Sequence, residues 1–295
     1  WKSLDGGNTW NRTANGLFAE SDIRAIAVRP DNPATLFAGT EAGLYRSDDA
    51  AESWSKVDLP VNDRQIWAIA IDPSTADIIF VGTCPSDLFK SEDGGESWHK
   101  LEVELAEECA GGAIIPRVTS IEIDPDDSNT IYAGTEPIDI FVSRDGAKSW
   151  TRLDAVWDIP FVATVPYPVA TVEPHVREVT IDPKDPKTIY AALQVGYILK
   201  SIDGGASWKL LNKELDCDVH TIVIDPDNTN NLFIATGGHD SRLGKAKGRA
   251  LYKSTDAGEK WVPTGLEFSQ EYSVPLTMHP NNPKVLYAGL AHGQP

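Results

Sequence analysis

An eight-residue signature, close to Ser-x-Asp-x-Gly-x-(Ser/Thr)-Trp, recurs six times along the 295-residue chain and constrains its fold more than any other feature. The copies begin at Ser3, Ser47, Ser91, Ser143, Ser201 and Ser254, and they end at Trp10, Trp54, Trp98, Trp150, Trp208 and Trp261. Self-similarity at a period of roughly 44–58 residues is typical of radial or stacked repeat proteins. A residue type that is present once per repeat is expected to build the scaffold, so function is expected where the repeats differ.

Each repeat also contains an alternating apolar run that ends in proline. The runs end at Pro30, Pro73, Pro125, Pro183, Pro226 and Pro280. A β-branched run stopped by proline predicts an inner strand that enters a turn, because proline cannot donate to the ladder. A second run, such as residues 36–40, contains small residues that suit a close approach of neighbouring backbones. Two further short runs flank the signature, so each repeat is expected to hold four antiparallel strands, as a β-propeller blade does.

The repeats predict an all-β fold, a six-bladed β-propeller of four-stranded antiparallel blades that occupies residues 1–295 as a single domain. If the strands of a blade are named A to D, five sets are complete and the sixth is divided between the two ends of the chain. Strands A and B of the sixth blade are expected in residues 270–295, and its strands C and D in residues 1–12. Pairing of these segments would close the ring and remove an exposed sheet edge.

The signature is expected to form the turn between strands C and D. Its Asp can accept hydrogen bonds from turn N–H groups, its Gly supplies a positive φ angle, and its Trp covers the hairpin. Ala51 and Ala147 stand where this Gly is expected. Their turns are therefore predicted either to be strained by about 1 kcal/mol or to use another turn type.

These signatures closely resemble the Asp-box, or bacterial neuraminidase repeat, and the resemblance covers the whole chain. Asp-box propellers include sialidases, the sortilin luminal domain, xyloglucan-active glycosidases and photosystem II assembly factors, so the resemblance implies the fold and leaves the function open. Sialidases carry an Arg-Ile-Pro motif, whereas Ile115-Pro116-Arg117 has those letters in another order. Sortilin-type domains have ten blades and xyloglucan-active members pair two seven-bladed propellers, so no specific member matches.

The chain is strongly acidic, with a formal net charge of −18. Phosphate-rich partners require a basic surface and the apolar stretches have only the length of strands, so neither nucleic acid binding nor membrane insertion is expected. Three cysteines form no Cys-x-x-Cys pair, and their odd number leaves the redox compartment open. The chain begins at Trp1, inside a repeat, so secreted, periplasmic and cytoplasmic locations fit equally well.

Three insertions make the repeats unequal, at residues 101–116, 153–174 and 237–249. They fall in D–A and B–C connections, which emerge on one face of a propeller, opposite the signature turns. Long loops on a rigid scaffold commonly carry binding and catalysis, so this face is the expected site. The loop at 153–174, which contains Trp157 and Tyr167, is expected to cover the pocket; the alternative is that it packs on neighbouring blades or forms an oligomer contact.

Four of the six histidines map to this loop-rich face, and they are the candidate ligands of a divalent metal ion: His175, His220, His239 and His292. Converging neutral imidazoles can bind Zn, Mn, Ni or Fe, or they can act as a general base. The candidate catalytic residues are His175, His220, Arg177 and Glu136. The alternative is structural, because His220 stands at a repeat position that other blades fill with Arg or Trp.

The candidate substrate-binding residues are arginines, aromatic residues and one amide near the same face. They are Arg24, Arg64, Trp67, Arg117, Trp157, Tyr167, Gln194 and Arg242. On an acidic chain, several arginines around one channel indicate a carboxylate-bearing or phosphorylated ligand. Structural salt bridges to Asp22, Glu178 or Asp218 explain the same arginines equally well.

Together these patterns favour a hydrolase or lyase that acts on a carbohydrate or another small polar, anionic substrate, with a divalent metal ion as the candidate cofactor. A classical sialidase activity is not expected. One alternative is a non-catalytic propeller that binds a protein or glycan partner. Another is a structural module of a larger extracellular or envelope protein.

Overall fold

The structure is a computed structural model that describes all residues except 19, 110–113, 163–174, 246–249, 265–271 and 292–295, and it leaves out the side chains of residues 241 and 242. The described residues form an all-β fold. Their helical segments are the 3₁₀ helix η1 (Asp154–Asp158) and the one-turn helix α1 (His239–Arg242). Neither is long enough to cross a membrane, and no other described helix meets that requirement.

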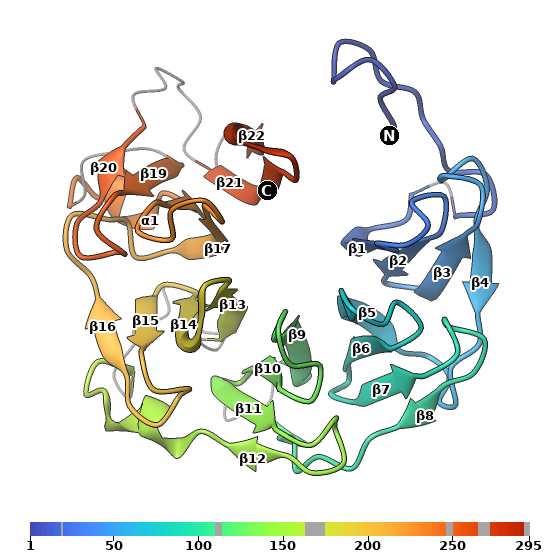
Figure 1. The fold of residues 1–295 in the computed structure, drawn as a ribbon, viewed down its shortest axis with the longest axis horizontal. Helices are drawn as coiled ribbons and strands as arrows, with labels where there is room; N and C mark the ends of the chain where they lie inside the picture. Colours follow the sequence, from blue (N-terminus) through green and yellow to red (C-terminus); the bar gives the residue numbers. More distant parts are fainter. Residues whose placement is uncertain (19, 110–113, 163–174, 246–249, 265–271, 292–295) are drawn as a thin grey trace. The chain divides into compact units, whose positions relative to one another are not determined.

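The chain divides into two compact units. Unit 1 comprises Trp1–Glu108, Ile115–Ile131 and Ser143–Trp150, and unit 2 comprises Cys109–Ile114, Tyr132–Val142 and Thr151–Pro295. Consecutive segments of the chain form consecutive antiparallel sheets (Figure 1). Five sheets have four strands and one has two strands.

Unit 1 contains two complete sheets and the first strand of a third. The first sheet consists of β1 (Ile23–Val28), β2 (Leu36–Thr40), β3 (Gly43–Ser47) and β4 (Ser55–Val57). The second consists of β5 (Gln65–Ile71), β6 (Ile79–Cys84), β7 (Leu88–Ser91) and β8 (His99–Lys100). The third, with residues from both units, consists of β9 (Arg117–Ile123), β10 (Ile131–Glu136), β11 (Asp139–Ser143) and β12 (Thr151–Arg152).

Unit 2 continues the same order. The fourth sheet consists of β13 (Val176–Asp182), β14 (Asp185–Leu193), β15 (Tyr197–Ser201) and β16 (Lys209–Leu211). The fifth consists of β17 (Val219–Ile224), β18 (Leu232–Thr236), β19 (Leu251–Ser254) and β20 (Val262–Pro263). The sixth has two strands, β21 (Tyr272–His279) and β22 (Asn282–Ala291). The four-strand repeat predicted from the sequence is thus confirmed for five sheets.

Glycines in the second strands allow neighbouring sheets to approach closely. A Cβ atom at Gly39 of β2 would lie 2.7 Å from Cγ2 of Ile66 in β5, and one at Gly82 of β6 would lie 2.6 Å from Cγ1 of Val118 in β9. Real Cβ atoms do not tolerate such separations from packed side chains. The small residues predicted for a crowded position are therefore required by the packing of one sheet on the next.

In several repeats, the tryptophan that ends the signature fills the space between two sheets. Trp98 packs in one core cluster with Phe37 and Leu44 of the preceding sheet. Trp261 packs in the same way with Tyr190 and Ile198. The tryptophans at positions 54, 98, 208 and 261 are at most 9% exposed. Because Trp98 and Trp261 cover the neighbouring sheet as well as their own hairpins, the signature builds the core as well as the turn.

The signature turns have the hydrogen bonds that the sequence predicts. In the third copy, Ser91 Oγ donates to Asp93 Oδ1 at 2.8 Å, and this oxygen accepts the Ser97 N–H at 2.9 Å. Ala51 and Ala147 adopt φ angles of 68° and 72°, so these residues keep the turn in the left-handed region that normally requires glycine. The strain predicted for the two positions therefore arises from the backbone conformation.

The carboxylates of these turns make the stability of the fold depend on pH. Hydrogen bonds from the Ser or Thr hydroxyl and amide four residues later, and from the first Ser, lower the pKa of five of them to about 2, from an ordinary value of 3.8. The five are Asp5, Asp49, Asp93, Asp145 and Asp203. Because the pKa is depressed in the folded state, this stabilisation is complete above the unfolded-state pKa and is lost as the pH falls through the folded-state pKa.

We therefore expect the melting temperature to fall as the pH is lowered from about 4 to about 2. Thermal melts followed by circular dichroism would measure this dependence. In an Asp93→Asn variant the melting temperature should be lower at neutral pH and should change less over this range. An equally steep acid transition in the variant and the parent would assign the transition to other groups.

Replacement of Gly95 by alanine should destabilise the fold by about 2–4 kcal/mol, since it combines overpacking with a left-handed backbone. Gly95 has a φ angle of +92°, and its Cβ would lie 2.7 Å from the ring of Phe37, which is fully buried. Gly244, with a φ of +70° and nothing within 4 Å of its Cβ, is the matched control, and its alanine variant should cost about 1 kcal/mol. Chemical denaturation measures both; equal costs would show that the contact with Phe37 is not limiting.

Candidate functional site

The first strands of successive sheets contact each other through side chains near their starting ends. The contacts join Arg24 to Gln65, Trp67 to Arg117 and His220 to Tyr272. In each contact, the second residue stands two repeat positions nearer the start of its strand than the first. The charge of Arg177 also acts on Asp218. Through these contacts, the sequence-predicted site residues fall into two groups, one in each unit.

In unit 2, His220 of β17 and Asp218 form a buried ion pair. His220 Nε2 lies 3.2 Å from Asp218 Oδ1, and the two residues are 4% and 2% exposed. His220 Nδ1 lies 2.8 Å from the carbonyl oxygen of Ser273. A carbonyl can only accept, so Nδ1 carries a proton and Nε2 faces the carboxylate.

The charge of Asp218 is stabilised by its neighbours. Burial acts to raise the pKa of Asp218, but the hydrogen bond from His220 and the positive charges of His220 and Arg177 outweigh it, so that the pKa lies below its ordinary value. A Cβ atom at Gly237 would lie 1.9 Å from Asp218 Oδ2. The absence of a side chain at Gly237 is therefore what admits the carboxylate to this position.

A second histidine–carboxylate pair lies at the start of β13. His175 Nδ1 is 3.4 Å from Glu136 Oε1 at the end of β10, and these residues are 2% and 0% exposed. The backbone carbonyl of His175 accepts the N–H of Gln194 at 3.0 Å. Gln194, a candidate for substrate binding, is thus held by the backbone of a candidate catalytic residue. The four candidate catalytic residues lie within unit 2: His175 and Glu136 form one buried pair, His220 pairs with Asp218, and the fourth is Arg177.

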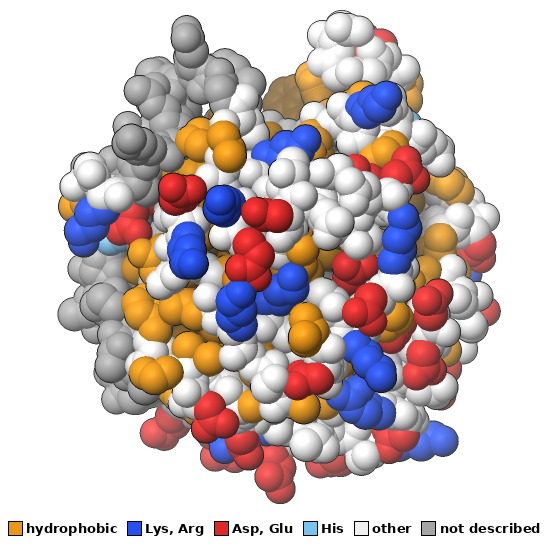
Figure 2. Space-filling view, turned by 60° about the vertical axis from the view of Figure 1, so that its left-hand side comes forward, with side chains coloured by type: hydrophobic (Ala, Val, Ile, Leu, Met, Phe, Trp, Pro, Cys, Tyr) orange, Lys and Arg blue, Asp and Glu red, His pale blue; other side chains and the backbone are white. Residues whose placement is uncertain are grey.

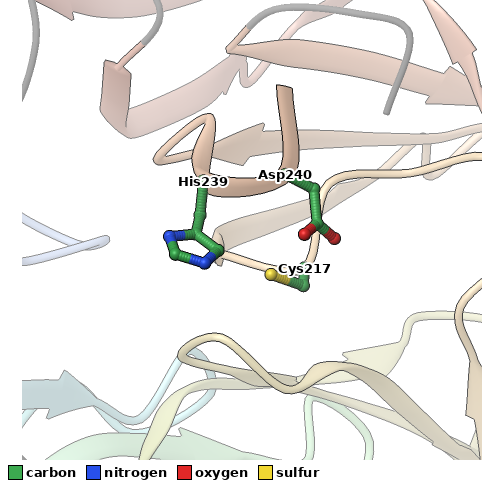
Figure 3. Close-up of side chains that lie close together, drawn as sticks. All are labelled: Cys217, His239 and Asp240. Carbon is green, nitrogen blue, oxygen red and sulfur yellow. The ribbon is translucent and has the colours of Figure 1, made fainter. Parts of the chain in front are cut away.

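The third histidine of this unit lies in a different group of donors. Cys217, His239 and Asp240 present a sulfur, a ring nitrogen and a carboxylate oxygen that lie within 4.8 Å of one another. Figure 3 shows these side chains directed toward one another, with His239 and Asp240 on α1 and Cys217 on the loop before β17. Of the four histidines expected to bind a metal, His239 is therefore in a potential ligand group, whereas His175 and His220 face carboxylates.

Unit 1 contains an aromatic ring that contacts two cations. The guanidinium carbons of Arg24 and Arg117 lie 4.2 and 3.9 Å from the ring centroid of Trp67. Arg24 also pairs with Asp22 at 3.1 Å and donates to Gln65. Three candidate substrate-binding residues are thus brought together, and the salt bridge to Asp22 that the sequence also suggested is formed.

Two other candidates for substrate binding are held by carboxylates. Arg64 Nε donates to Asp87 Oδ2 at 2.7 Å, and Lys100 reaches the other oxygen of Asp87 at 2.6 Å. Trp157 of η1 is 44% exposed and donates its Nε1–H to Asp139 Oδ1 at 3.0 Å. Burial raises the pKa of Asp139, and Trp157 and Arg152 oppose this rise. Tyr167, His292 and the side chain of Arg242 lie outside the described residues.

Sequence reasoning overlooked three residues of the unit 2 site, namely Asp216, Cys217 and Tyr197. Asp216 Oδ1 accepts the N–H groups of Asp218 and His239, both at 3.0 Å. Tyr197 donates its hydroxyl to Asp240 Oδ2 at 3.0 Å, from a backbone with a φ angle of 62°. A run of two aspartates around a cysteine, immediately before an inner strand, was the available signal. It matches no short metal-binding motif.

Outside these clusters, the charged side chains of the visible surface are mixed. Figure 2 shows Lys and Arg side chains interspersed with Asp and Glu on one face, without a continuous basic patch there. Several of the described surface cations are paired, for example Lys209 with Glu259 at 2.6 Å.

Comparison with known proteins places the repeat among β-propellers. Residues 1–113 match the family model described as "Sortilin, neurotensin receptor 3". No curated protein sequence gives a significant match.

Several solved structures share the fold at low sequence identity. A GH74 xyloglucanase from Xanthomonas campestris has a TM-score of 0.73 and 18% identity, over 96% of this chain and 43% of that chain. YCF48 from Cyanidioschyzon merolae has a TM-score of 0.55 and 17% identity, over 93% and 94%. A chain of the COPII outer coat vertex on membranes has a TM-score of 0.64 and 10% identity, over 93% and 68%. This chain spans less than half the length of the xyloglucanase.

The Sortilin-Vps10 match and these propellers together show that the chain has the Asp-box type of β-propeller fold, without matching a specific member.

Proposed function

We propose that the protein is a hydrolase or lyase that acts on a carbohydrate or another small polar, anionic substrate. The observation that carries this proposal is the buried Asp218–His220 pair in unit 2, on which the charge of Arg177 acts. Buried pairs of titratable groups are commonly used in general acid–base catalysis. Two such pairs occur in unit 2, since His175 and Glu136 form the second.

In this proposal each residue has a defined role. The His175–Glu136 pair takes a proton from water or from a carbon next to a carboxylate. His220, as an imidazolium that Asp218 stabilises, gives its Nε2 proton to the leaving group, and its contact with Ser273 O keeps the ring in one orientation. Arg177 binds the acidic group of the substrate by charge-assisted hydrogen bonds.

The similar xyloglucanase shows that this type of fold supports polysaccharide hydrolysis elsewhere, although at 18% identity it supports only the fold here. A substrate panel therefore tests the proposal. It should contain neutral and uronate-containing oligosaccharides, with reducing-end release reporting hydrolysis and ultraviolet absorbance of an unsaturated product reporting elimination. Turnover of a uronate substrate, and much less of its neutral analogue, is the expected result. No turnover of any member would contradict it.

The second candidate is a non-catalytic propeller that binds a protein or glycan, and one observation favours it. Trp157 is 44% exposed although its indole N–H is held by Asp139, so a rigid aromatic surface is available to a partner. YCF48 and the COPII coat chain are propellers that share the fold of this chain. Glycan-array binding that is lost in Trp157→Ala and unaffected by His220→Gln would favour this candidate.

We also propose that the chain forms a single six-bladed propeller, in which residues 1–12 complete the blade that β21 and β22 begin. A repeated contact supports this closure. Three cations that directly precede a signature serine donate to a carbonyl in the following signature: Arg46 to Gly94, Lys90 to Gly146 and Lys200 to Ala257. Lys2 donates to Ala50 O at 2.7 Å in the same manner, so the Lys2–Asn11 hairpin contacts the first sheet as a preceding blade would.

The other end of the chain offers the complementary surface. An apolar cavity of about 670 Å³ lies between the fifth and sixth sheets, and its lining includes Phe233 and Leu251. These residues stand at the repeat positions of Phe37 and Leu44, which cover Trp98. The closure proposal therefore places Trp10 in this cavity. In the described structure, the side chain of Trp10 is 57% exposed, whereas the other signature tryptophans are buried or partly buried.

A further inference from the structure

The group formed by Cys217, His239 and Asp240 has the donor set of a transition-metal site. Thiolate sulfur and imidazole nitrogen favour zinc-class ions over Mg²⁺ and Ca²⁺, which prefer oxygen ligands only. The donors come from two segments that are distant in sequence, the loop before β17 and helix α1. Convergence of such donors from separate segments requires the fold to bring them together.

The spacing of the donors suits a small ion after a modest adjustment. Tetrahedral zinc with bond lengths of about 2.0–2.3 Å keeps its ligand atoms about 3.3–3.7 Å apart. The three atoms here lie within 4.8 Å of one another, so changes in side-chain torsion bring them to a common centre. Three protein ligands leave a fourth position for water, as in zinc sites that are open to substrate.

The surroundings of these donors carry excess negative charge. Cys217 and Asp240 are 4% and 7% exposed, and the adjacent Asp216 and Asp218 are 0% and 2% exposed. A bound divalent cation would offset this negative charge.

A second set of contacts fixes the orientation of the ligands. The hydroxyl of Tyr197 binds Asp240 Oδ2, and the backbone N–H of Tyr197 donates to the carbonyl of Cys217 at 2.9 Å. Asp216 accepts the N–H of His239, which positions the first residue of α1. Metal sites commonly hold their ligands through outer contacts of this kind.

From the converging donors, their burial and these outer contacts, we propose that Cys217, His239 and Asp240 bind one divalent transition-metal ion of the zinc class. The ion ties the insertion that carries α1 to the loop before β17, next to the Asp218–His220 pair. This proposal does not depend on the catalytic one, because binding is measured without substrate. The ligand set differs from the four histidines that the sequence suggested, and it retains only His239 from the part of that set which the structure describes.

The test uses the tag-free full chain, stripped of metal by a chelator and titrated with Zn²⁺ against a competing chromophoric chelator. One zinc ion per chain is expected. Titration with Co²⁺ should give a thiolate-to-cobalt charge-transfer band, which requires sulfur coordination. Cys217→Ser should abolish the band, and His239→Asn should weaken zinc binding by at least 100-fold. Tyr197→Phe, which leaves all three ligands in place, should weaken it by about 10–100-fold.

Two matched controls keep the result interpretable. Cys84→Ser removes a different buried cysteine and His279→Gln removes a histidine outside the cluster, and neither should change zinc affinity. Circular dichroism of every variant separates loss of binding from loss of fold, and His239→Asn provides a test at a position that is only partly buried. Absence of stoichiometric zinc binding by the parent protein would overturn the proposal. Full retention of the cobalt band in Cys217→Ser would do the same.

Discussion

Replacement of Trp10 by alanine should lower the free energy of unfolding by about 3–5 kcal/mol, the cost of removing a buried tryptophan from a core. This result is expected because the proposed closure of a sixth blade would place the indole against Phe233 and Leu251, in the cavity between the fifth and sixth sheets. The corresponding tryptophans of other blades are covered in this way, as Trp98 is by Phe37 and Leu44. Chemical denaturation of the purified chain measures the change.

The same experiment distinguishes closure from its alternatives. Trp157→Ala removes an exposed tryptophan outside the signatures and should cost less than about 1 kcal/mol. A double-mutant cycle with Phe233→Ala should show a coupling energy of about 0.5–3 kcal/mol, because contacting residues are not additive. If closure occurs between two copies, the stability and the molecular mass will depend on protein concentration. A cost for Trp10→Ala as small as that for Trp157→Ala would contradict closure in either form.

Replacement of His220 by glutamine should lower the rate on an accepted substrate by about 10²–10⁴-fold, the usual contribution of a positioned acid or base. The fall should appear in kcat, because His220 moves a proton and does not hold the acidic group of the substrate. Arg177→Lys should instead raise KM, since lysine replaces a bidentate contact by a point charge. Initial rates over a range of substrate concentrations separate the two effects.

His279→Gln serves as the control for this series, because His279 ends β21 and its ring accepts only the Asn281 N–H among the described hydrogen bonds. Its kinetic constants should equal those of the parent. Thermal melts of each variant identify any loss of activity that follows from unfolding. Unchanged kcat in a folded His220→Gln variant would remove the proton-transfer role from the Asp218–His220 pair.

The sequence predicted the repeat well because the signature is a local device. Asp93 and Ser97 are four residues apart, and their hydrogen bonds follow from that spacing alone. The glycines of the second strands could also be anticipated, since only a small residue suits a close approach such as that of Gly39 to Ile66. The closure of the ring is a contact between the two ends of the chain. It therefore stays a prediction, supported by the environments of Lys2 and Trp10.

The candidate site was less accessible to sequence reasoning, because its contacts join different sheets. Glu136 and His175 are far apart in sequence and meet only because β10 ends where β13 begins. The sequence-based prediction also gave histidines the main role as metal donors. The ligand group contains one histidine together with a thiol and a carboxylate, and Cys217 reaches His239 only through the short helix in the insertion. No spacing rule contains that information.

The contact from a strand cation to the next signature links the dynamics of neighbouring blades. Lys200 donates to Ala257 O, so the turn that contains Ala257 can open fully only when the fourth sheet releases it. Amide protons of that turn should therefore exchange with solvent more slowly in the parent than in a Lys200→Met variant, although no backbone hydrogen bond is removed. Local opening of one blade is therefore coupled to local opening of its neighbour. The signature turns, although they lie at the surface, stabilise neighbouring blades against opening separately.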